Sequence, residues 1–322
     1  MAPRHNLVLC FDAFGTLIKP KQPIVKQYAL VAEQCGLKNI DVSQLKASFA
    51  AAYKAESAAH PNYGKASDMG AERWWTNVIT STFLPLLPAS QPLPPSLAPR
   101  LLHRFSSSEG YDLCEPELGP LLAAVKSGSA GSPKKTIITG VITNSDDRIP
   151  SILSSLGLEL GSFRFGSRLR SQQTLEEEKQ APNDLDFNCM SYDVGFAKPS
   201  RAIFDAAAGM ARSVLRAQTE GGEEQEQEDE RVWTKVYVGD EVRNDLLAAA
   251  EAGWHSILVV GRGETVDGRG DGIPGDLAEL EDCGGGDKRL EEVFPSGGKQ
   301  EKEMTMMRAG SLKTVLEWFG RH

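Results

Sequence analysis

Four short apolar segments, separated by sequence with helical spacing, constrain the fold of this chain more than any other feature. They cover residues 7–11, 137–143, 236–238 and 257–260. Three of them are rich in β-branched side chains, which is typical of parallel strands buried on both faces. Apolar faces at helical spacing follow the later segments, two of them stopped by Gly157 and Gly253. The alternation predicts an α/β fold with a doubly wound parallel sheet and right-handed crossovers.

Residues 19–114, between the first two predicted strands, form a segment too long for a simple crossover. Its apolar residues recur at helical spacing in four places, and Asp41 is a plausible N-cap for the second of these helices. We therefore predict an α-helical cap subdomain over 19–114, inserted into a core domain made of 1–18 and 115–322.

Three further stretches of the predicted core domain, residues 166–188, 218–231 and 261–305, look irregular. They are polar, acidic or rich in glycine, and they lack a steady apolar period. We predict that they are loop insertions.

Charge and composition exclude several classes of partner. The net charge is −9, and seven of the 44 acidic residues lie in the tract 220–230, so we expect no nucleic-acid partner. No run of 18 or more apolar residues appears, so we expect no membrane span. The five cysteines are scattered and form no CxxC pair, which favours a reducing compartment, the cytoplasm or alternatively the nucleus. The oligomeric state is left open.

Asp12 ends the first predicted strand, and a turn with Gly15 and Thr16 follows it. In an open α/β sheet, ligands bind outside the carboxyl ends of the strands, which is where this carboxylate would lie. A turn or helix-capping aspartate is an equally good reading of this segment taken alone.

Three other motifs stand at the end of a predicted strand or the start of a helix. Thr143 and Asn144 end the second strand, where a hydroxyl and backbone N–H groups can hold phosphate oxygens. Lys198 precedes Pro199 before a predicted helix, a position that the helix dipole disfavours for a cation, so a carboxylate or a bound anion would have to fix it. Taken alone, each of these two motifs is better explained by strand termination and helix capping, or by an exposed loop lysine.

The fourth motif places an unusual number of oxygen ligands after the strand that ends at Gly239. They are Asp240, Glu241, Asn244 and Asp245. Oxygen ligands gathered in this way suit Mg²⁺, and capping alone does not explain so many acids in one short loop. A parallel sheet would bring all four motifs to the same edge, so together they predict one site.

The order and spacing of these motifs resemble the haloacid dehalogenase-like hydrolase superfamily, with its Rossmann-like core. The closest resemblance is to eukaryotic haloacid dehalogenase-like hydrolase domain-containing proteins with a helical cap, of a fungal type. Two stretches carry that finer likeness, NYGKASDMGAERWW and AKPSRAIF.

The resemblance implies a role for each motif. Asp12 would be the nucleophile, Thr143 and Asn144 would hold the transferring group, and Lys198 would neutralise charge. Mg²⁺ would be bound by Asp12, the backbone carbonyl of Phe14 and Asp240. Asp245 would support the metal site, with Glu241 as a substitute. The helical insertion would close over a small-molecule substrate.

Phe14 departs from the phosphatase pattern. Phosphatases of this superfamily usually carry a second aspartate two residues after the nucleophile, as general acid and base, and losing such a group typically costs ~10²–10⁴-fold in rate. The 2-haloacid dehalogenases carry a similar DAYGTL-like motif without the second acid, but they need no metal, whereas this chain keeps Asp240.

Three functions therefore compete at the level of sequence. The first is a Mg²⁺-dependent phosphohydrolase that forms an aspartyl-phosphate on Asp12. The second is a metal-independent 2-haloacid dehalogenase-like hydrolase that forms an ester on the same residue. The third is a binding or regulatory protein on a catalytically weak scaffold. Asp240 favours the first, and Phe14 favours the other two.

Overall fold

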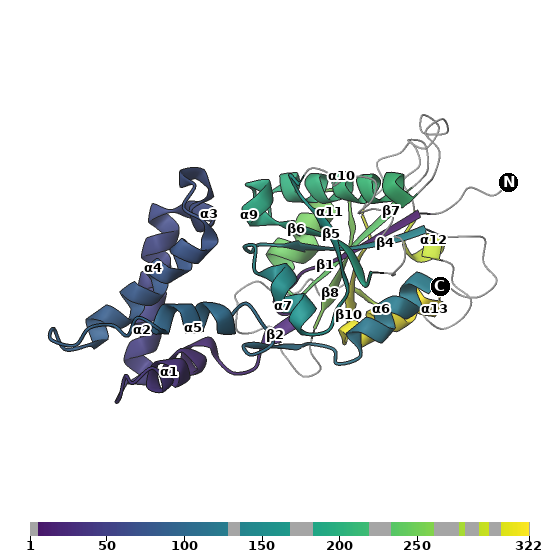
Figure 1. Ribbon diagram of the computed structural model, residues 1–322. Coiled ribbons are helices and arrows are strands. Elements are labelled where there is room, and N and C mark those ends of the chain that lie inside the picture. The colour runs from purple at the N-terminus through teal and green to yellow at the C-terminus, as the bar shows by residue number, and fades with distance from the viewer. Residues whose placement is uncertain are drawn as a thin grey trace. The chain divides into compact units, whose positions relative to one another are not determined.

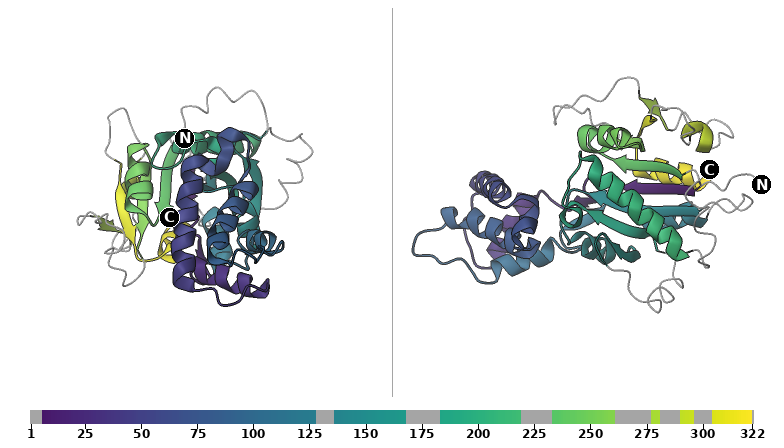
Figure 2. Two further views of the ribbon diagram at one scale, coloured as in Figure 1. Left: turned by 90° about the vertical axis from the view of Figure 1, so that its left-hand side faces the viewer. Right: turned by 90° about the horizontal axis from the view of Figure 1, so that it is seen from above.

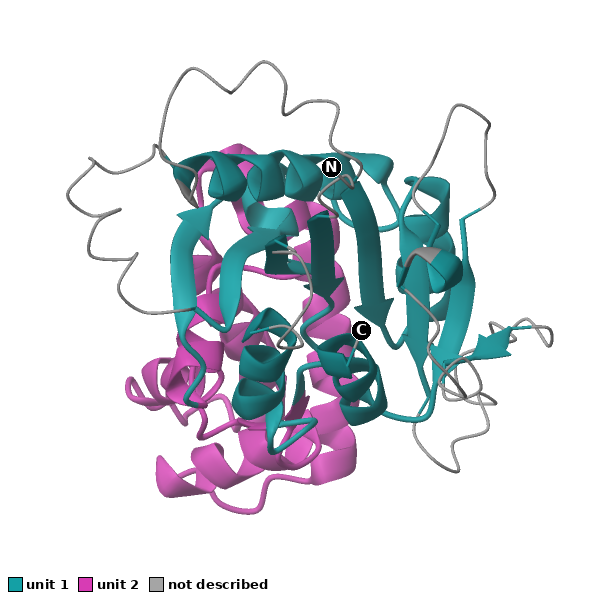
Figure 3. Ribbon diagram, turned by 90° about the vertical axis from the view of Figure 1, so that its right-hand side faces the viewer, with its two compact units in different colours: residues 1–18, 113–144, 157–322 teal, residues 19–112, 145–156 magenta. Residues whose placement is uncertain are grey.

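The computed structural model describes residues 6–127, 136–167, 183–218, 233–260, 277–280, 290–295 and 304–321. The chain forms two compact units, coloured separately in Figure 3. The first contains residues 1–18, 113–144 and 157–322, and the second contains residues 19–112 and 145–156.

The first unit is built on an eight-stranded sheet with the order β5-β6-β4-β1-β7-β8-β10-β9. All of its neighbouring strands run parallel. The strands are β1 (Asn6–Phe11), β4 (Thr136–Thr143), β5 (Leu160–Arg164), β6 (Leu185–Met190), β7 (Trp233–Gly239), β8 (His255–Val259), β9 (Ala278–Glu279) and β10 (Met306–Ala309). The predicted parallel sheet and all four predicted strands are confirmed.

Strand β6 corrects one prediction, because the expected insertion at 166–188 runs four residues into it. Asp186 and Asn188 interrupt the apolar pattern of this strand, yet every residue of β6 is buried. The Asp186 carboxylate is satisfied inside the core by the Lys126 ammonium at 2.7 Å and by the Thr139 backbone N–H at 2.8 Å. A buried charge with such partners is tolerated, and the strand can form despite its polar residues.

Helices cover both faces of the sheet, as a doubly wound fold requires. Helix α10 (Arg201–Gln218) lies over one face, and α6 (Leu118–Ser127) with α13 (Leu312–Arg321) lies over the other (Figure 1). The view from above shows α10 crossing the sheet (Figure 2). The other helices among the described residues of this unit are α9 (Ser191–Val194), the π-helix η4 (Val242–Leu247), α11 (Ala248–Glu251) and α12 (Leu290–Val293).

The second unit is helical. Its elements are α1 (Ile24–Gln34), α2 (Val42–Ala59), α3 (Pro61–Gly64), the 3-10 turns η1 (Lys65–Ser67) and η2 (Leu84–Leu86), α4 (Ala71–Phe83), α5 (Leu97–Arg104) and α7 (Ile149–Ser155). Asp41 caps α2 by accepting a hydrogen bond from the Gln44 backbone N–H at 2.8 Å, as expected. The chain enters and leaves the helical insertion through two paired strands, β2 (Ile18–Pro20) and β3 (Tyr111–Leu113).

Residues 145–156 pack with the helical unit, although they follow Asn144 directly in the chain. The Asp146 carboxylate accepts a hydrogen bond from the Trp75 indole at 2.6 Å and pairs with Arg148, whose guanidinium lies 4.4 Å from the centre of the Trp75 ring. Trp74, the neighbouring tryptophan, is fully buried. Of the two adjacent tryptophans, Trp74 therefore belongs to the core of the helical unit, and Trp75 contacts the ion pair of Asp146 and Arg148.

Parts of all three predicted insertions lie outside the described residues, namely 168–182, 219–231 and most of 261–305. Within the predicted insertion 261–305, the described residues include β9 and α12. None of the helices in the described ranges combines the length and the apolar character needed to span a membrane.

Candidate active site

The order of the central strands brings the predicted motifs together. Strand β1 pairs with β4 on one side and with β7 on the other, so the carboxyl ends of all three strands are neighbours. Asp12 follows β1, Thr143 ends β4, and Asp240 follows β7. The Asp12 backbone N–H continues the ladder by donating to the Val238 carbonyl at 2.8 Å. The site is thus assembled by strand pairing.

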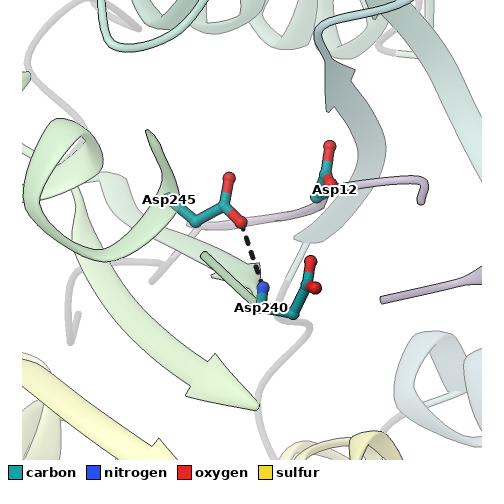
Figure 4. A group of neighbouring side chains, drawn as sticks. All are labelled: Asp12, Asp240 and Asp245. Carbon is teal, nitrogen blue, oxygen red and sulfur yellow. Dashed lines mark hydrogen bonds between the residues drawn. The ribbon is translucent and has the colours of Figure 1, made fainter. Parts of the chain in front are cut away.

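Three carboxylates form the centre of this site. Asp12, Asp240 and Asp245 each offer an oxygen atom, and these atoms all lie within 4.8 Å of one another (Figure 4). Carboxylate oxygens gathered in this way are suitable ligands for a hard divalent cation. Glu241, the proposed substitute, lies outside this group of acids, and its carboxylate accepts a hydrogen bond from the Asn244 amide at 2.7 Å.

Asp245 fixes, by hydrogen bonds to its backbone, the loop after β7 that carries Asp240 and Glu241. Its Oδ2 atom accepts hydrogen bonds from the backbone N–H groups of Asp240 and Glu241, at 3.0 and 2.9 Å. Gly239 makes this approach feasible, because a Cβ atom there would lie 2.3 Å from the Asp245 Cγ. Gly15, at φ +91°, is needed for a similar reason, since its Cβ would lie 2.2 Å from an Asp240 carboxylate oxygen.

We expect Gly239→Ala to displace Asp245 and to lower the free energy of unfolding by about 1–3 kcal/mol, the usual cost of overpacking. Gly209→Ala is the matched control, because Gly209 lies within α10 and its Cβ would meet only the tip of Arg212, at 3.9 Å. That change should stabilise the protein by roughly 0.5–1 kcal/mol. Urea unfolding of both variants measures the difference, and equal effects of the two substitutions would contradict this packing argument.

Lys198 lies between two of the acids. Its ammonium donates to Asp12 Oδ1 at 2.8 Å and to Asp245 Oδ1 at 2.6 Å, and its side chain is 3% exposed. The helix dipole disfavours a cation just before α10, and these two carboxylates are the groups that hold Lys198 there. A third contact, to the Tyr237 hydroxyl at 2.7 Å, was not predicted.

Burial and charge perturb both groups of the central ion pair. Burial raises the pKa of Asp12 to about 6, and the nearby charge of Lys198 opposes that rise. Burial disfavours the charged form of Lys198, but the carboxylates of Asp12 and Asp245 outweigh it and raise its pKa. The lysine therefore stays charged at neutral pH, while Asp12 titrates within a physiological range.

Asn144 is placed to fix the backbone at Lys198. Its amide group donates to the Lys198 carbonyl at 2.9 Å, and its side-chain oxygen accepts from the Lys198 N–H at 2.6 Å. This reciprocal pair joins the end of β4 to the segment before α10. Thr143, one residue earlier, is 1% exposed at the same edge of the sheet.

Two contacts of the site could not be predicted from the sequence. Tyr237 reads as an ordinary apolar residue of β7, yet its hydroxyl reaches Lys198. Thr16 donates to Asp240 Oδ1 at 3.4 Å, a long contact across 224 residues of sequence. Both contacts join residues far apart in the sequence, so only the folded chain reveals these partners.

The chain is similar to known hydrolases. A family model described as HAD-hydrolase-like matches residues 195–280. An uncharacterised hydrolase of Schizosaccharomyces pombe is 28% identical over 260 residues, which cover 80% of this chain and 93% of that protein. Haloacid dehalogenase-like hydrolase domain-containing protein 3 of Mus musculus is 28% identical over 263 residues, covering 81% and 85%.

Solved structures show the same fold at low sequence identity. The L-2-haloacid dehalogenase PA0810 matches with a TM-score of 0.52 and 12% identity, over 96% of this chain and 97% of that one. The L-2-haloacid dehalogenase RSc1362 matches with a TM-score of 0.50 and 13% identity, over 99% of each chain. These likenesses show the architecture and leave the reaction to be argued from the site.

Proposed function

Because this chain belongs to the haloacid dehalogenase-like hydrolases, we propose that it is a Mg²⁺-dependent phosphohydrolase with Asp12 as its nucleophile. The observation that carries the proposal is the group of three carboxylates, two of which share the single ammonium of Lys198. Asp12, Asp240 and Asp245 bring three negative charges when ionised, and Lys198 returns one positive charge. An excess of negative charge in a largely buried site favours binding of a cation.

The proposed metal ligands differ in how far their oxygen atoms are engaged by the protein. Asp245 accepts from Lys198 with one oxygen and from two backbone N–H groups with the other. It is therefore better suited to orienting the site than to binding the ion directly. Asp12, Asp240 and the carbonyl of Phe14 would hold Mg²⁺, which would supply positive charge to the phosphoryl oxygens.

The protein's own groups account for the covalent chemistry. A carboxylate oxygen of Asp12 forms a bond to phosphorus, and the bond to the leaving group breaks with its electron pair. Water then attacks the aspartyl-phosphate at phosphorus, the bond from phosphorus to the Asp12 oxygen breaks and restores the carboxylate, and the protons of the water leave with the released phosphate. Lys198 would oppose the negative charge of the phosphoryl group near Asp12, and Thr143 with the turn at Asn144 would hold its oxygens. The helical unit would serve as the cap that excludes water.

We expect Mg²⁺ to stabilise the wild-type protein and to have much less effect on Asp240→Asn, which removes one anionic ligand. A ligand at about 100 times its dissociation constant raises the free energy of unfolding by about 2.7 kcal/mol. Melting curves in Mg²⁺ and in EDTA, with orthovanadate added as a phosphate analogue, measure this difference. Asp205→Asn, an exposed change on α10, is the matched control and should respond to Mg²⁺ like the wild type.

Phe14 predicts a preference among phosphate esters. A leaving alkoxide needs a proton that Phe14 cannot give, whereas p-nitrophenolate leaves without one. The wild type should therefore hydrolyse p-nitrophenyl phosphate much faster than alkyl phosphates. Phe14→Asp should raise alkyl phosphate hydrolysis selectively, by up to ~10²–10⁴-fold. The Phe14 side chain is only partly buried, which leaves room for the change. Equal wild-type rates on both classes of ester would contradict the proposed role of Phe14.

A 2-haloacid dehalogenase is the second candidate, and Phe14 is the observation that favours it. A halide leaves without a proton, so that reaction needs no acid at this position. Water would then attack the carboxyl carbon of the Asp12 ester, so a single turnover in ¹⁸O-labelled water would place the label in Asp12. The phosphohydrolase would place the label in phosphate, so the two reactions are distinguishable by mass spectrometry.

A further inference from the structure

We propose that Tyr237 is a positioning residue of this site, whose phenolic oxygen fixes the Lys198 ammonium against Asp12. The inference rests on the proposed function in one respect, since Lys198 is taken to act on the charge of a substrate. It adds to the proposed site a residue whose side chain lies in the hydrophobic core and not at the carboxyl ends of the strands.

Tyr237 joins the hydrophobic core to the polar site. Its side chain is fully buried in the apolar cluster between the sheet and α10, and its ring meets Phe204 edge to face, with centroids 5.2 Å apart. Its hydroxyl oxygen lies 2.7 Å from the Lys198 Nζ atom. Packing therefore holds the ring rigidly, and the ring holds the oxygen.

The distances around the Tyr237 hydroxyl show which atom it donates its proton to and which atom donates to it. The Tyr237 hydroxyl has one proton, and its closest carbonyl acceptor is Ile142 O, at 2.7 Å, whereas Asp245 Oδ1 lies at 3.3 Å. Because the hydroxyl donates that proton in a hydrogen bond to the Ile142 carbonyl, the lone pairs of the phenolic oxygen are free to accept from Lys198. The hydroxyl thereby connects β7, the end of β4 and the lysine.

Lys198 in turn has three N–H donors and three acceptors within 2.8 Å, namely Asp12, Asp245 and Tyr237. Two carboxylates alone would allow the ammonium to shift toward either of them. A third acceptor on a rigid ring removes that freedom without adding charge. Since the ammonium must lie near both Asp12 and the incoming phosphoryl group, its placement bears on the rate of the chemical step.

The test is Tyr237→Phe in the full-length protein, which removes only the hydroxyl. We expect a crystal structure to show Lys198 Nζ shifted away from Asp12. We expect kcat for p-nitrophenyl phosphate to fall by between about 10-fold and 10²-fold, the order of effect expected for a misplacement near 1 Å, with little change in KM. Thr139→Val is the matched control, because Thr139 also uses a buried hydroxyl in the sheet, bonded to Asp184 O at 2.8 Å. It should lose stability and keep kcat.

An unchanged distance between Lys198 Nζ and Asp12 together with an unchanged kcat would overturn the inference. So would an equal loss of kcat in Thr139→Val at equal stability. If Tyr237→Phe does not fold, 3-fluorotyrosine incorporated at position 237 keeps the hydroxyl but weakens it as an acceptor. We then expect kcat to fall by less than the range given for Tyr237→Phe. An unchanged kcat in the fluorotyrosine variant would overturn the inference. If the wild type hydrolyses no phosphate ester in Mg²⁺, the proposed function fails, and the lysine position in the two crystal structures still decides the role of Tyr237.

Discussion

Asp12→Asn should abolish turnover while the protein keeps its fold. The carboxamide has nearly the shape of the carboxylate but cannot form the phosphoryl ester, so kcat should fall by at least about 10⁴-fold. Burial already raises the pKa of Asp12 to about 6, so its negative charge is a cost to the folded state at neutral pH. The melting temperature of Asp12→Asn should therefore change little or rise.

Asp186→Asn is the matched control for this substitution. Asp186 is also a buried aspartate paired with a lysine, but it lies within β6 and contacts Lys126 and Thr139. We expect it to lose stability and to keep kcat, the reverse of the result at position 12. Wild-type activity in Asp12→Asn, on any confirmed substrate, would exclude Asp12 as the nucleophile.

The second large effect is expected on stability, in Lys198→Met. This change leaves Asp12 and Asp245 facing each other without their shared ammonium. Removing one partner from a buried ion pair typically costs 3–5 kcal/mol, so the free energy of unfolding should fall by ~3–5 kcal/mol at pH 8 in EDTA. Urea unfolding at several pH values provides the measurement.

The loss in Lys198→Met should shrink as the pH is lowered. The folded-state pKa of Asp12, about 6, lies above the ordinary value of 3.8, so the contribution of this group to stability is present at low pH and is lost as the pH rises through about 6. Without Lys198, which lowers that pKa, the carboxyl should hold its proton to still higher pH. Wild-type Lys198, whose pKa is raised, stays charged throughout this range. The deficit should therefore be smaller at pH 5 than at pH 8.

Lys313→Met is the control for the loss of a lysine. Lys313 pairs with Glu117 on the surface at 2.6 Å, where water screens the interaction. We expect little change in stability and no dependence on pH between 5 and 8. A deficit in Lys198→Met that is small, or that does not change with pH, would show that the buried pair is not coupled as the distances imply.

The fold could be predicted from the sequence wherever a strand consists of one uninterrupted apolar run. The apolar runs that became β1, β4, β7 and β8 are recognisable because both faces of these strands are covered. Strand β6 was missed because Asp186 and Asn188 interrupt its pattern, and the partners that satisfy the Asp186 carboxylate lie on other elements. Residues 145–156 were assigned to the predicted core domain because nothing local in their sequence indicates the hydrogen bond from Trp75.

The sequence predicted which strand ends meet at the candidate site, but it did not predict the hydrogen bonds between the side chains there. Asp12, Asp240 and Asp245 could be grouped because parallel strands end at one edge, and the structure gathers their carboxylates. The sequence could not show that Asn144 binds the backbone of Lys198, or that Tyr237 supplies a third acceptor. Those contacts depend on the register of β4, β1 and β7, which only the folded chain displays.

Release of phosphate from p-nitrophenyl phosphate by the wild type, in Mg²⁺ and in EDTA, tests the central claim most directly, with halide release from 2-chloropropionate measured in parallel. The proposed function predicts phosphate release in Mg²⁺, its loss in EDTA and in Asp12→Asn, and no halide release under either condition. Halide release that persists in EDTA, without phosphate release in Mg²⁺, would contradict the claim and would favour the dehalogenase.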